Sequence, residues 1–226
     1  MVVTKRFFTP RNNGEQTIII FANSIKNSGS CVAGKCIKTG KWIRLVNCEK
    51  GSALPNYKTR VFNIKKREKW PLKILQKVGF YVSKHVPLEN HQPENYTILD
   101  RGLFDNYRIF PQDLNYYLDN PTDLWGYGDS INYTDIKEKN IIINQSLYLI
   151  NVEDLVLYYK EYNGKLRRRA AFMYNGLNYD FSVTDREFDK ILNNNKEIQL
   201  TRGILCISLG EPFNNHSYKL VASIIL

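Results

Sequence analysis

The chain has 226 residues and a formal net charge of +10, and it contains 43% hydrophobic and 24% charged residues. This composition is that of a folded globular protein and excludes a mostly disordered chain. No stretch approaches the roughly 20 consecutive apolar residues that cross a bilayer, and the start lacks the apolar core of a signal peptide. We therefore expect a cytoplasmic protein with no membrane partner.

The positive charge is concentrated in the first half. Residues 1–100 hold 18 Lys and Arg against 6 Asp and Glu, whereas residues 101–150 hold 4 against 7. A strongly basic half favours a polyanion partner such as nucleic acid. A composition rich in Lys, Asn, Ile and Tyr is the alternative explanation, although it does not account for the asymmetry.

The first half reads as strands. Apolar and alternating segments predict strands over 17–24, 31–38, 41–47 and 78–86, with a tight turn at Thr39-Gly40 between the second and third. Residues 57–77 stay unassigned, and the basic run at 65–69 reads as a solvated strand or loop.

An acidic connection follows. A short helix is predicted within 110–121, because Pro111 suits a first helical position and the apolar residues after it recur at helical spacing. Residues 122–140 are rich in turn formers and predict a long irregular connection.

The last third predicts strands over 145–162, 165–174 and 177–183, a helix over 184–195, and strands over 202–210 and 217–226. Asn175-Gly176 is a strong hairpin signal, and Thr184 with Glu187 has the spacing of a capping box. Three strands, a helix and two strands is the order of the OB-fold, a Greek-key barrel.

We therefore predict a mostly β protein with two OB-like Greek-key barrels, short helices and an irregular connecting segment. The expected organisation is an N-terminal tail over 1–15, a first barrel over 16–100, a connecting segment with a short helix over 101–144, and a second barrel over 145–226.

Several segments in register resemble the dual OB-containing domain of bacterial and archaeal proteins. They include "FANSIKNSGSCVAGKCIKTGKWIRLV", "NPTDLWG", "YNGLNYDFSVTD" and "LCISLGEPFNNHSYKLVASII". The resemblance implies a two-barrel module with no established reaction, associated with nucleic-acid binding and with prokaryotic conflict or phage-defence systems. It supplies no catalytic residues, and Cys36 stands where the family pattern has an acidic or polar residue.

The first candidate site is the hairpin around Thr39-Gly40. Trp42 and Arg44 share one face of their strand; a two-residue turn sets Lys35 beside them, and a three-residue loop shifts the partner strand by one. Together with Lys41, these residues predict a nucleic-acid platform, on which each stacked base contributes about 1–3 kcal/mol. The alternative is that Trp42 anchors the barrel core.

The second candidate lies on the Asn175-Gly176 hairpin. A two-residue turn there places Arg169 opposite Ser182 and diagonal to Asp180, which leaves Arg167 the freer cation and Arg168 on the apolar face. Charged OB faces bind oligonucleotides, so Arg167 and Arg169 are candidate nucleic-acid contacts.

A third cluster could line a ligand cleft between the barrels, formed by His91, Gln92, Glu94 and Trp125. It has no nucleophile and no phosphate-binding glycine loop, so no catalytic residue is assigned. The alternative is that these side chains tie an irregular loop to the backbone.

The four cysteines are Cys31, Cys36, Cys48 and Cys206. Their spacing does not match the paired ligands of a structural zinc site. We expect free thiols, no metal and no cofactor.

The leading hypothesis is a non-catalytic module that binds single-stranded RNA or DNA. A nucleotide-ligand sensor or enzyme with a site between the barrels is one alternative. A protein-interaction adaptor that docks onto a protein partner is another.

Overall fold

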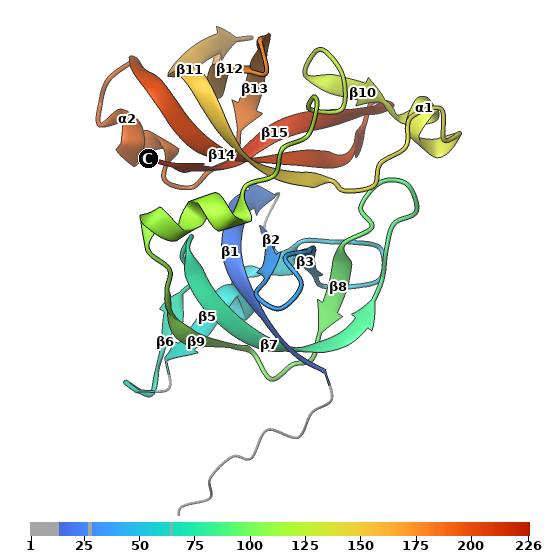
Figure 1. Cartoon of the computed structure of the whole chain (residues 1–226), viewed down its shortest axis with the longest axis vertical. Coiled ribbons are helices and arrows are strands. Elements are labelled where there is room, and N and C mark those ends of the chain that lie inside the picture. Colours follow the sequence, from blue (N-terminus) through green and yellow to red (C-terminus); the bar gives the residue numbers. More distant parts are fainter. Residues whose placement is uncertain (1–13, 27–28, 64) are drawn as a thin grey trace, which may run out of the picture.

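Two β-barrels are stacked along the long axis of the molecule in the computed structural model, which describes residues 14–26, 29–63 and 65–226 (Figure 1). The predicted class, mostly β with two OB-like barrels and short helices, is confirmed. Of the N-terminal tail expected over 1–15, residues 1–13 lie outside the described part of the chain.

The first barrel has the OB strand order. Its sheet runs β1–β2–β3–β8–β7, and β7 pairs back onto β1 to close it; β3 and β8 are parallel and the other neighbours antiparallel. The strands are β1 (Glu15–Lys26), β2 (Gly29–Cys36), β3 (Trp42–Val46), β7 (Gln76–His85) and β8 (Asn95–Ile98).

An extension of this sheet accounts for residues 54–63 and 65–71, most of which the sequence left unassigned. β9 (Leu103–Arg108) pairs with β7 and in parallel with β5 (Arg60–Asn63), which forms a hairpin with β6 (Glu68–Pro71). The short β4 (Leu54–Pro55) and the 3-10 helix η1 (Asn56–Thr59) precede β5. The basic run at 65–69 is the exposed end of the β5–β6 hairpin.

The second barrel repeats the same order as β11–β12–β13–β15–β14, with β14 returning to β11 and with β13 parallel to β15. The strands are β11 (Leu147–Tyr162), β12 (Lys165–Tyr174), β13 (Leu177–Val183), β14 (Glu197–Phe213) and β15 (His216–Ile225). The predicted register across Asn175-Gly176 is confirmed, since Tyr174 pairs with Leu177 and Arg169 with Ser182.

The connecting segment is more regular than predicted. The short helix is the 3-10 helix η2 (Pro111–Tyr117), and residues 122–140 include β10 (Ser130–Asn132), which pairs with β15, and α1 (Tyr133–Lys137). Pairing with a distant strand supplies the hydrogen bonds of β10, and a local sequence pattern does not contain that information.

The predicted capping box on the last helix is wrong. Helix α2 (Phe188–Leu192) begins after Glu187, and the Thr184 hydroxyl donates to the carbonyl of Val221. The Asp185 carboxylate instead accepts the backbone N–H groups of Glu187 and Ile224, so it ties the start of this segment to β15.

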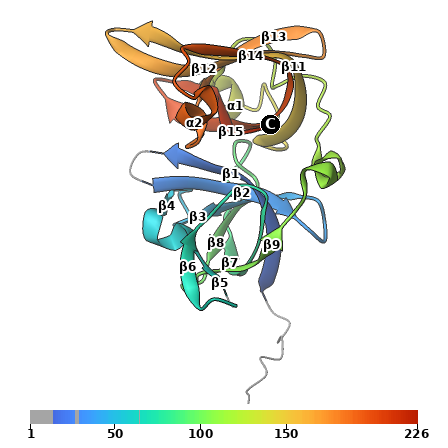
Figure 2. The same ribbon diagram turned by 90° about the vertical axis from the view of Figure 1, so that its left-hand side faces the viewer.

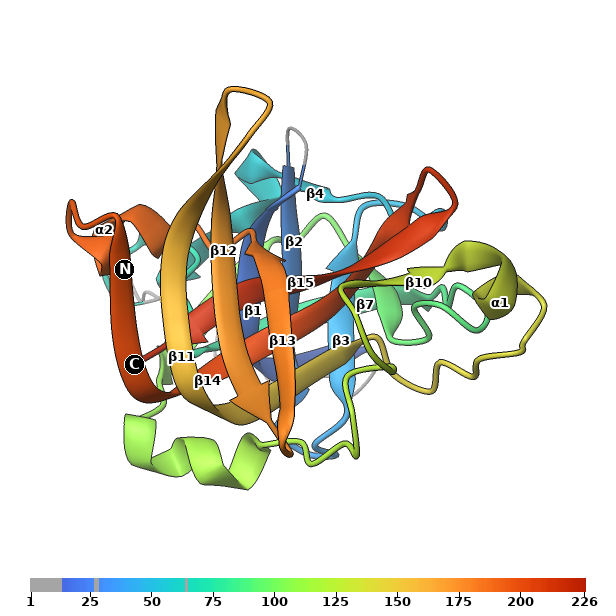
Figure 3. The same ribbon diagram turned by 90° about the horizontal axis from the view of Figure 1, so that it is seen from above.

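A shared apolar cluster joins the barrels. β1 is buried on both faces: Ile18 and Ile20 enter the core of the first barrel, while Ile19 and Phe21 face the second. The same apolar cluster includes Leu149 and Cys206 of the second barrel and Leu114 of η2. Seen from above, the second barrel covers the first, with α1 and α2 on opposite sides (Figure 3).

None of the helices in the described ranges combines the length and the apolar character that crossing a membrane requires.

Candidate nucleic-acid interface

The hairpin between β2 and β3 turns through residues 37–40, with Gly40 at φ 68°. Lys35 pairs with Trp42, and Ala33 pairs with Arg44. The loop is therefore longer than either predicted turn. Because the register is shifted by two residues from that of a two-residue turn, Lys35, Trp42 and Arg44 still share one face, and Cys36, Ile43 and Leu45 enter the barrel core.

That shared face is covered, so it does not form the expected solvent-facing platform. Trp42 is only 6% exposed, and its Nε1 donates to Asp119 over 3.0 Å. Lys35 Nζ lies 2.6 Å from the other oxygen of Asp119 and 2.7 Å from the carbonyl oxygen of Tyr117. Trp42 is buried, as the alternative interpretation expected, but in the joint between the barrels and not in the barrel core.

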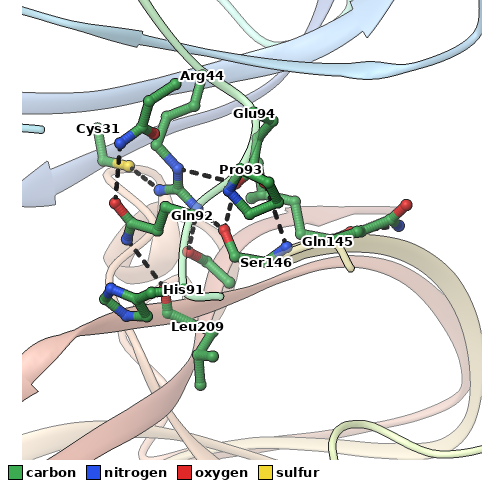
Figure 4. Close-up of polar contacts among 12 residues, drawn as sticks. Cys31, Arg44, His91, Gln92, Pro93, Glu94, Gln145, Ser146 and Leu209 are labelled. Carbon is green, nitrogen blue, oxygen red and sulfur yellow. Dashed lines mark hydrogen bonds and ion pairs between the residues drawn. The ribbon is translucent and has the colours of Figure 1, made fainter. Parts of the chain in front are cut away.

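Arg44 lies at the centre of the joint between the barrels (Figure 4). Its guanidinium is 3.3 Å from Glu94 in the first barrel, and it donates over 2.8 Å to the hydroxyl of Ser146, just before β11, and over 3.3 Å to that of Ser208 in β14. Burial opposes the charge, but Cys31 and Glu94 outweigh it and raise the pKa of Arg44. Arg44 therefore binds the second barrel and not a ligand.

The loop before β8 completes the joint. His91 and Gln92 are buried; His91 Nε2 lies 2.8 Å from the carbonyl oxygen of Gly210, and Gln92 Nε2 donates to that of Leu209 over 3.3 Å. Burial lowers the pKa of His91, which favours the neutral imidazole. These bonds tie the loop to β14 and leave the predicted cleft closed at these side chains.

Trp125, the fourth residue of the predicted cleft, packs in the second barrel. Its Nε1 donates to the carbonyl of Gln145 over 3.0 Å, and its ring stacks on Tyr148 with centroids 4.5 Å apart. It therefore belongs to a different set of contacts from His91.

Lys41 is the one residue of the predicted first platform, among those described, that remains exposed. It lies at the edge of a hollow of about 530 Å³ whose walls include Trp42, His85 and Glu94. The walls of this hollow are formed by residues near the joint between the barrels, and they do not include a row of cations.

On the second barrel the predicted arrangement of Arg169 is observed. Its guanidinium lies 3.0 Å from Asp180 and donates to Ser182 over 2.9 Å, and Arg167 is exposed opposite Lys160. Arg168 is on the same face of β12 as the buried Ala170, and its guanidinium reaches Asp189 of α2 at 2.5 Å. The carboxylate of Asp180 reduces the positive charge of this face.

A different exposed surface combines aromatic rings with cations. We call it the aromatic–basic face; it lies on the outer side of β7 and β9 and consists of Lys77, Tyr81, Arg101, Phe104 and Tyr107. Lys77 Nζ is 4.7 Å from the ring centroid of Tyr107, which is 58% exposed. The guanidinium carbon of Arg101 is 5.1 Å from the centroid of Tyr81.

Gly79 makes this face flat at its centre. A Cβ there would lie 2.0 Å from Cε2 of Phe104, so only glycine lets the Phe104 ring lie across β7. The Phe104 ring also contacts the ring of Tyr81, with the two centroids 5.9 Å apart. Sequence reasoning recognised β7 but missed the face, because its other half is β9, whose pairing partners are distant in the chain.

The cysteines are free thiols: Cys36 and Cys206 are buried, and Cys31 and Cys48 partly so. Burial raises the pKa of the Cys206 thiol. Within residues 14–26, 29–63 and 65–226, no group of three or more His, Cys, Asp or Glu side chains is placed to hold a metal ion.

The comparisons with known proteins bear on the family. A family model described as "Dual OB-containing domain" matches residues 16–224. No curated protein matches the chain. One solved structure, described as the crystal structure of the tetrameric p202 HIN2, is 9% identical, with 94% of this chain and 92% of that chain covered at a TM-score of 0.32.

The family match spans both barrels, and each barrel closes in the strand order of an OB-fold. The chain belongs to the dual OB-containing domain family.

Proposed function

We propose that this protein is a non-catalytic module that binds single-stranded RNA or DNA through the aromatic–basic face. The supporting observation is the combination of Tyr107, Phe104 and Tyr81 with Lys77 and Arg101 on one sheet surface. Proteins that bind single strands stack bases on such rings and hold the phosphates with neighbouring cations.

The position of this face also supports the proposal. In the first barrel, the second and third strands carry Trp42 and Arg44, and that surface is closed by the second barrel. In the second barrel, the equivalent strands carry Arg169, which Asp180 neutralises. The aromatic–basic face combines the exposed ring of Tyr107 and the half-buried rings of Tyr81 and Phe104 with two cations, Lys77 and Arg101.

The family resemblance further suggests a setting in prokaryotic conflict or phage defence. In such a system this module would supply nucleic-acid recognition, and the reaction itself would come from a protein partner, because no catalytic group is assigned to the chain.

Fluorescence anisotropy with labelled single-stranded RNA and DNA tests the proposal. Wild-type protein is expected to bind at low salt, and Tyr107→Ala should weaken binding by about 1–3 kcal/mol, or 5- to 150-fold, because one stacked base is lost. Lys77→Gln should reduce the slope of log K against log salt concentration by about 0.7, the value for one phosphate contact on a single strand.

Tyr127→Ala is the matched control, since Tyr127 is 80% exposed but lies in the segment before β10. It should bind as the wild type does. Absence of binding by the wild type at low salt, or equal losses in Tyr107→Ala and Tyr127→Ala, would overturn the proposal.

A further inference from the structure

A hollow of about 930 Å³ opens between the two barrels, on the side of α2. Its walls come from η1, β5, the connection from β6 to β7 and the end of β9 in the first barrel, and from the start of α2 in the second. Figure 2 shows α2 lying above this part of the first barrel. The hollow is on the opposite side of the molecule from α1 and the His91 loop, whose Asn90 side chain bonds to α1.

Among the charged side chains that line the hollow, cations outnumber carboxylates. Two carboxylates, Asp185 and Glu187, face five cations. The cations are Arg60, Lys73, Arg108, Arg186 and Lys190.

Both carboxylates already have partners. Asp185 is 4% exposed and accepts two backbone N–H groups, and Glu187 lies 2.6 Å from Lys190 Nζ in an exposed pair. Exposed pairs of this kind are worth about 0–1 kcal/mol, so a phosphate can compete for Lys190.

Three cations of the first barrel keep most of their donors available. Arg60 donates to the carbonyl oxygen of Lys69 over 2.8 Å, and Arg108 donates to that of Ile74 over 3.2 Å. A guanidinium has five N–H donors, so these contacts leave donors for an anion. Lys73 is exposed at the rim. Arg186, by contrast, is committed to Asn23 and Ser30 and has a structural role.

The hollow adjoins the end of β9 that carries part of the aromatic–basic face. Arg108 directly follows Tyr107 in β9, so the two side chains lie on opposite sides of the strand, Arg108 in the wall of the hollow and Tyr107 on the outer face. Tyr57, which is 69% exposed, stands at the rim and adds another ring. The end of β9 therefore brings the wall of the hollow next to the aromatic–basic face.

We propose that a nucleic-acid strand lying on the aromatic–basic face runs on into this hollow, where Arg60, Lys73 and Arg108 of the first barrel and Lys190 of the second bind its phosphates. This inference rests on the proposed function and extends it: both barrels contribute to one binding path. The proposed ligand is a single strand, because a hollow of this volume has the size of a small-ligand site.

A length series of oligonucleotides tests the inference. A strand of about 4 nucleotides covers the aromatic–basic face alone, and one of about 12 nucleotides reaches the hollow, within the range of site sizes that OB-folds show. The Arg60→Gln/Lys73→Gln double variant should weaken binding of the longer strand about tenfold and reduce its salt slope by about 1.4, with the short strand unaffected. Lys190→Gln, on the other barrel, should reduce the slope for the longer strand by about 0.7.

Lys139→Gln is the matched control, because Lys139 is an exposed, ion-paired lysine next to α1 on the opposite side. It should bind both lengths as the wild type does. Wild-type binding of the long strand by the hollow variants, or loss in the first-barrel variant but not in Lys190→Gln, would overturn the shared path while the proposed function stands. Failure of Tyr107→Ala to weaken binding of the short strand would overturn the proposed function itself.

Discussion

The outer surface of the second and third strands is buried in the first barrel and more exposed in the second. In the first barrel, β2 and β3 present Lys35, Trp42 and Arg44, and the second barrel buries them. In the second barrel, β12 presents Arg167 to solvent and holds Arg169 in a partly exposed pair with Asp180 of β13. The same position in the fold is therefore an internal joint in one copy and an open surface in the other.

This difference shows how charged groups are kept inside the molecule. The two buried cations of this joint each have a carboxylate from a distant segment: Lys35 pairs with Asp119, and Arg44 pairs with Glu94. Asp119 also accepts the N–H of Leu149 in β11, so one side chain connects the first barrel, the connecting segment and the second barrel. Buried charges of this kind require fixed partners, and they favour one relative orientation of the barrels.

The comparison predicts its largest effect at Arg44. Arg44→Met removes one partner of a buried pair and leaves Glu94 uncompensated, so we expect a loss of about 3–5 kcal/mol in the free energy of unfolding. Urea denaturation followed by intrinsic fluorescence measures it. The Arg44→Met/Glu94→Gln double variant should recover part of the loss. A single variant as stable as the wild type would contradict the role of Arg44 in the joint.

Trp42 should show a smaller effect. Trp42→Phe keeps the ring in the apolar joint but removes the hydrogen bond to the Asp119 carboxylate, so we expect about 1.5–3 kcal/mol of destabilisation. Trp70→Phe is the control, because Trp70 is 37% exposed and bonds to Glu68 at the surface. Equal losses in the two variants would show that Trp42 is not held by its buried bond.

The open surface of the second barrel should be less sensitive. Arg169→Met breaks a partly exposed pair with Asp180, and we expect a loss of about 1 kcal/mol in the free energy of unfolding, measured as for Arg44→Met. A loss as large as that of Arg44→Met would mean that the two surfaces do not differ in the way their exposure indicates.

The smallest expected effect is a pH dependence from His91. Burial lowers the pKa of His91 below its usual value near 6.5, so the unfolded chain binds more protons between the two values. The contribution of neutral His91 to the free energy of unfolding is therefore complete above about pH 6.5 and is lost as the pH falls below that value. The free energy of unfolding then changes by at most about 1.4 kcal/mol per pH unit. His91→Gln should make the stability profile flatter over that range in thermal melts at several pH values. An identical stability profile in His91→Gln would contradict this role of His91.

The sequence predicted the second barrel well, for a physical reason. A two-residue Asn-Gly turn allows one register, so the pairing of Arg169 with Ser182 and the nearby Asp180 followed directly. At the β2–β3 hairpin the turn was longer than predicted, yet the shift by an even number of residues kept Lys35, Trp42 and Arg44 on one face.

What covers that face could not be predicted. Its partners are Asp119, Ser146 and Ser208, which lie 77 to 164 residues away along the chain. The aromatic–basic face was missed for the same kind of reason, since it depends on β9 pairing with β7 and in parallel with β5. Local patterns specify strands and tight turns, whereas the burial of a surface depends on contacts that only the complete fold brings together.

The apolar cluster between the barrels has a practical consequence for dissecting this protein. A chain cut before β11 would expose Phe21, Trp42 and Leu114 to water, and the other fragment would expose Leu149 and Cys206. Neither barrel should then be soluble or stable alone. The intact protein should unfold in a single cooperative transition, so its two OB-like units behave as one folding unit despite their repeated topology.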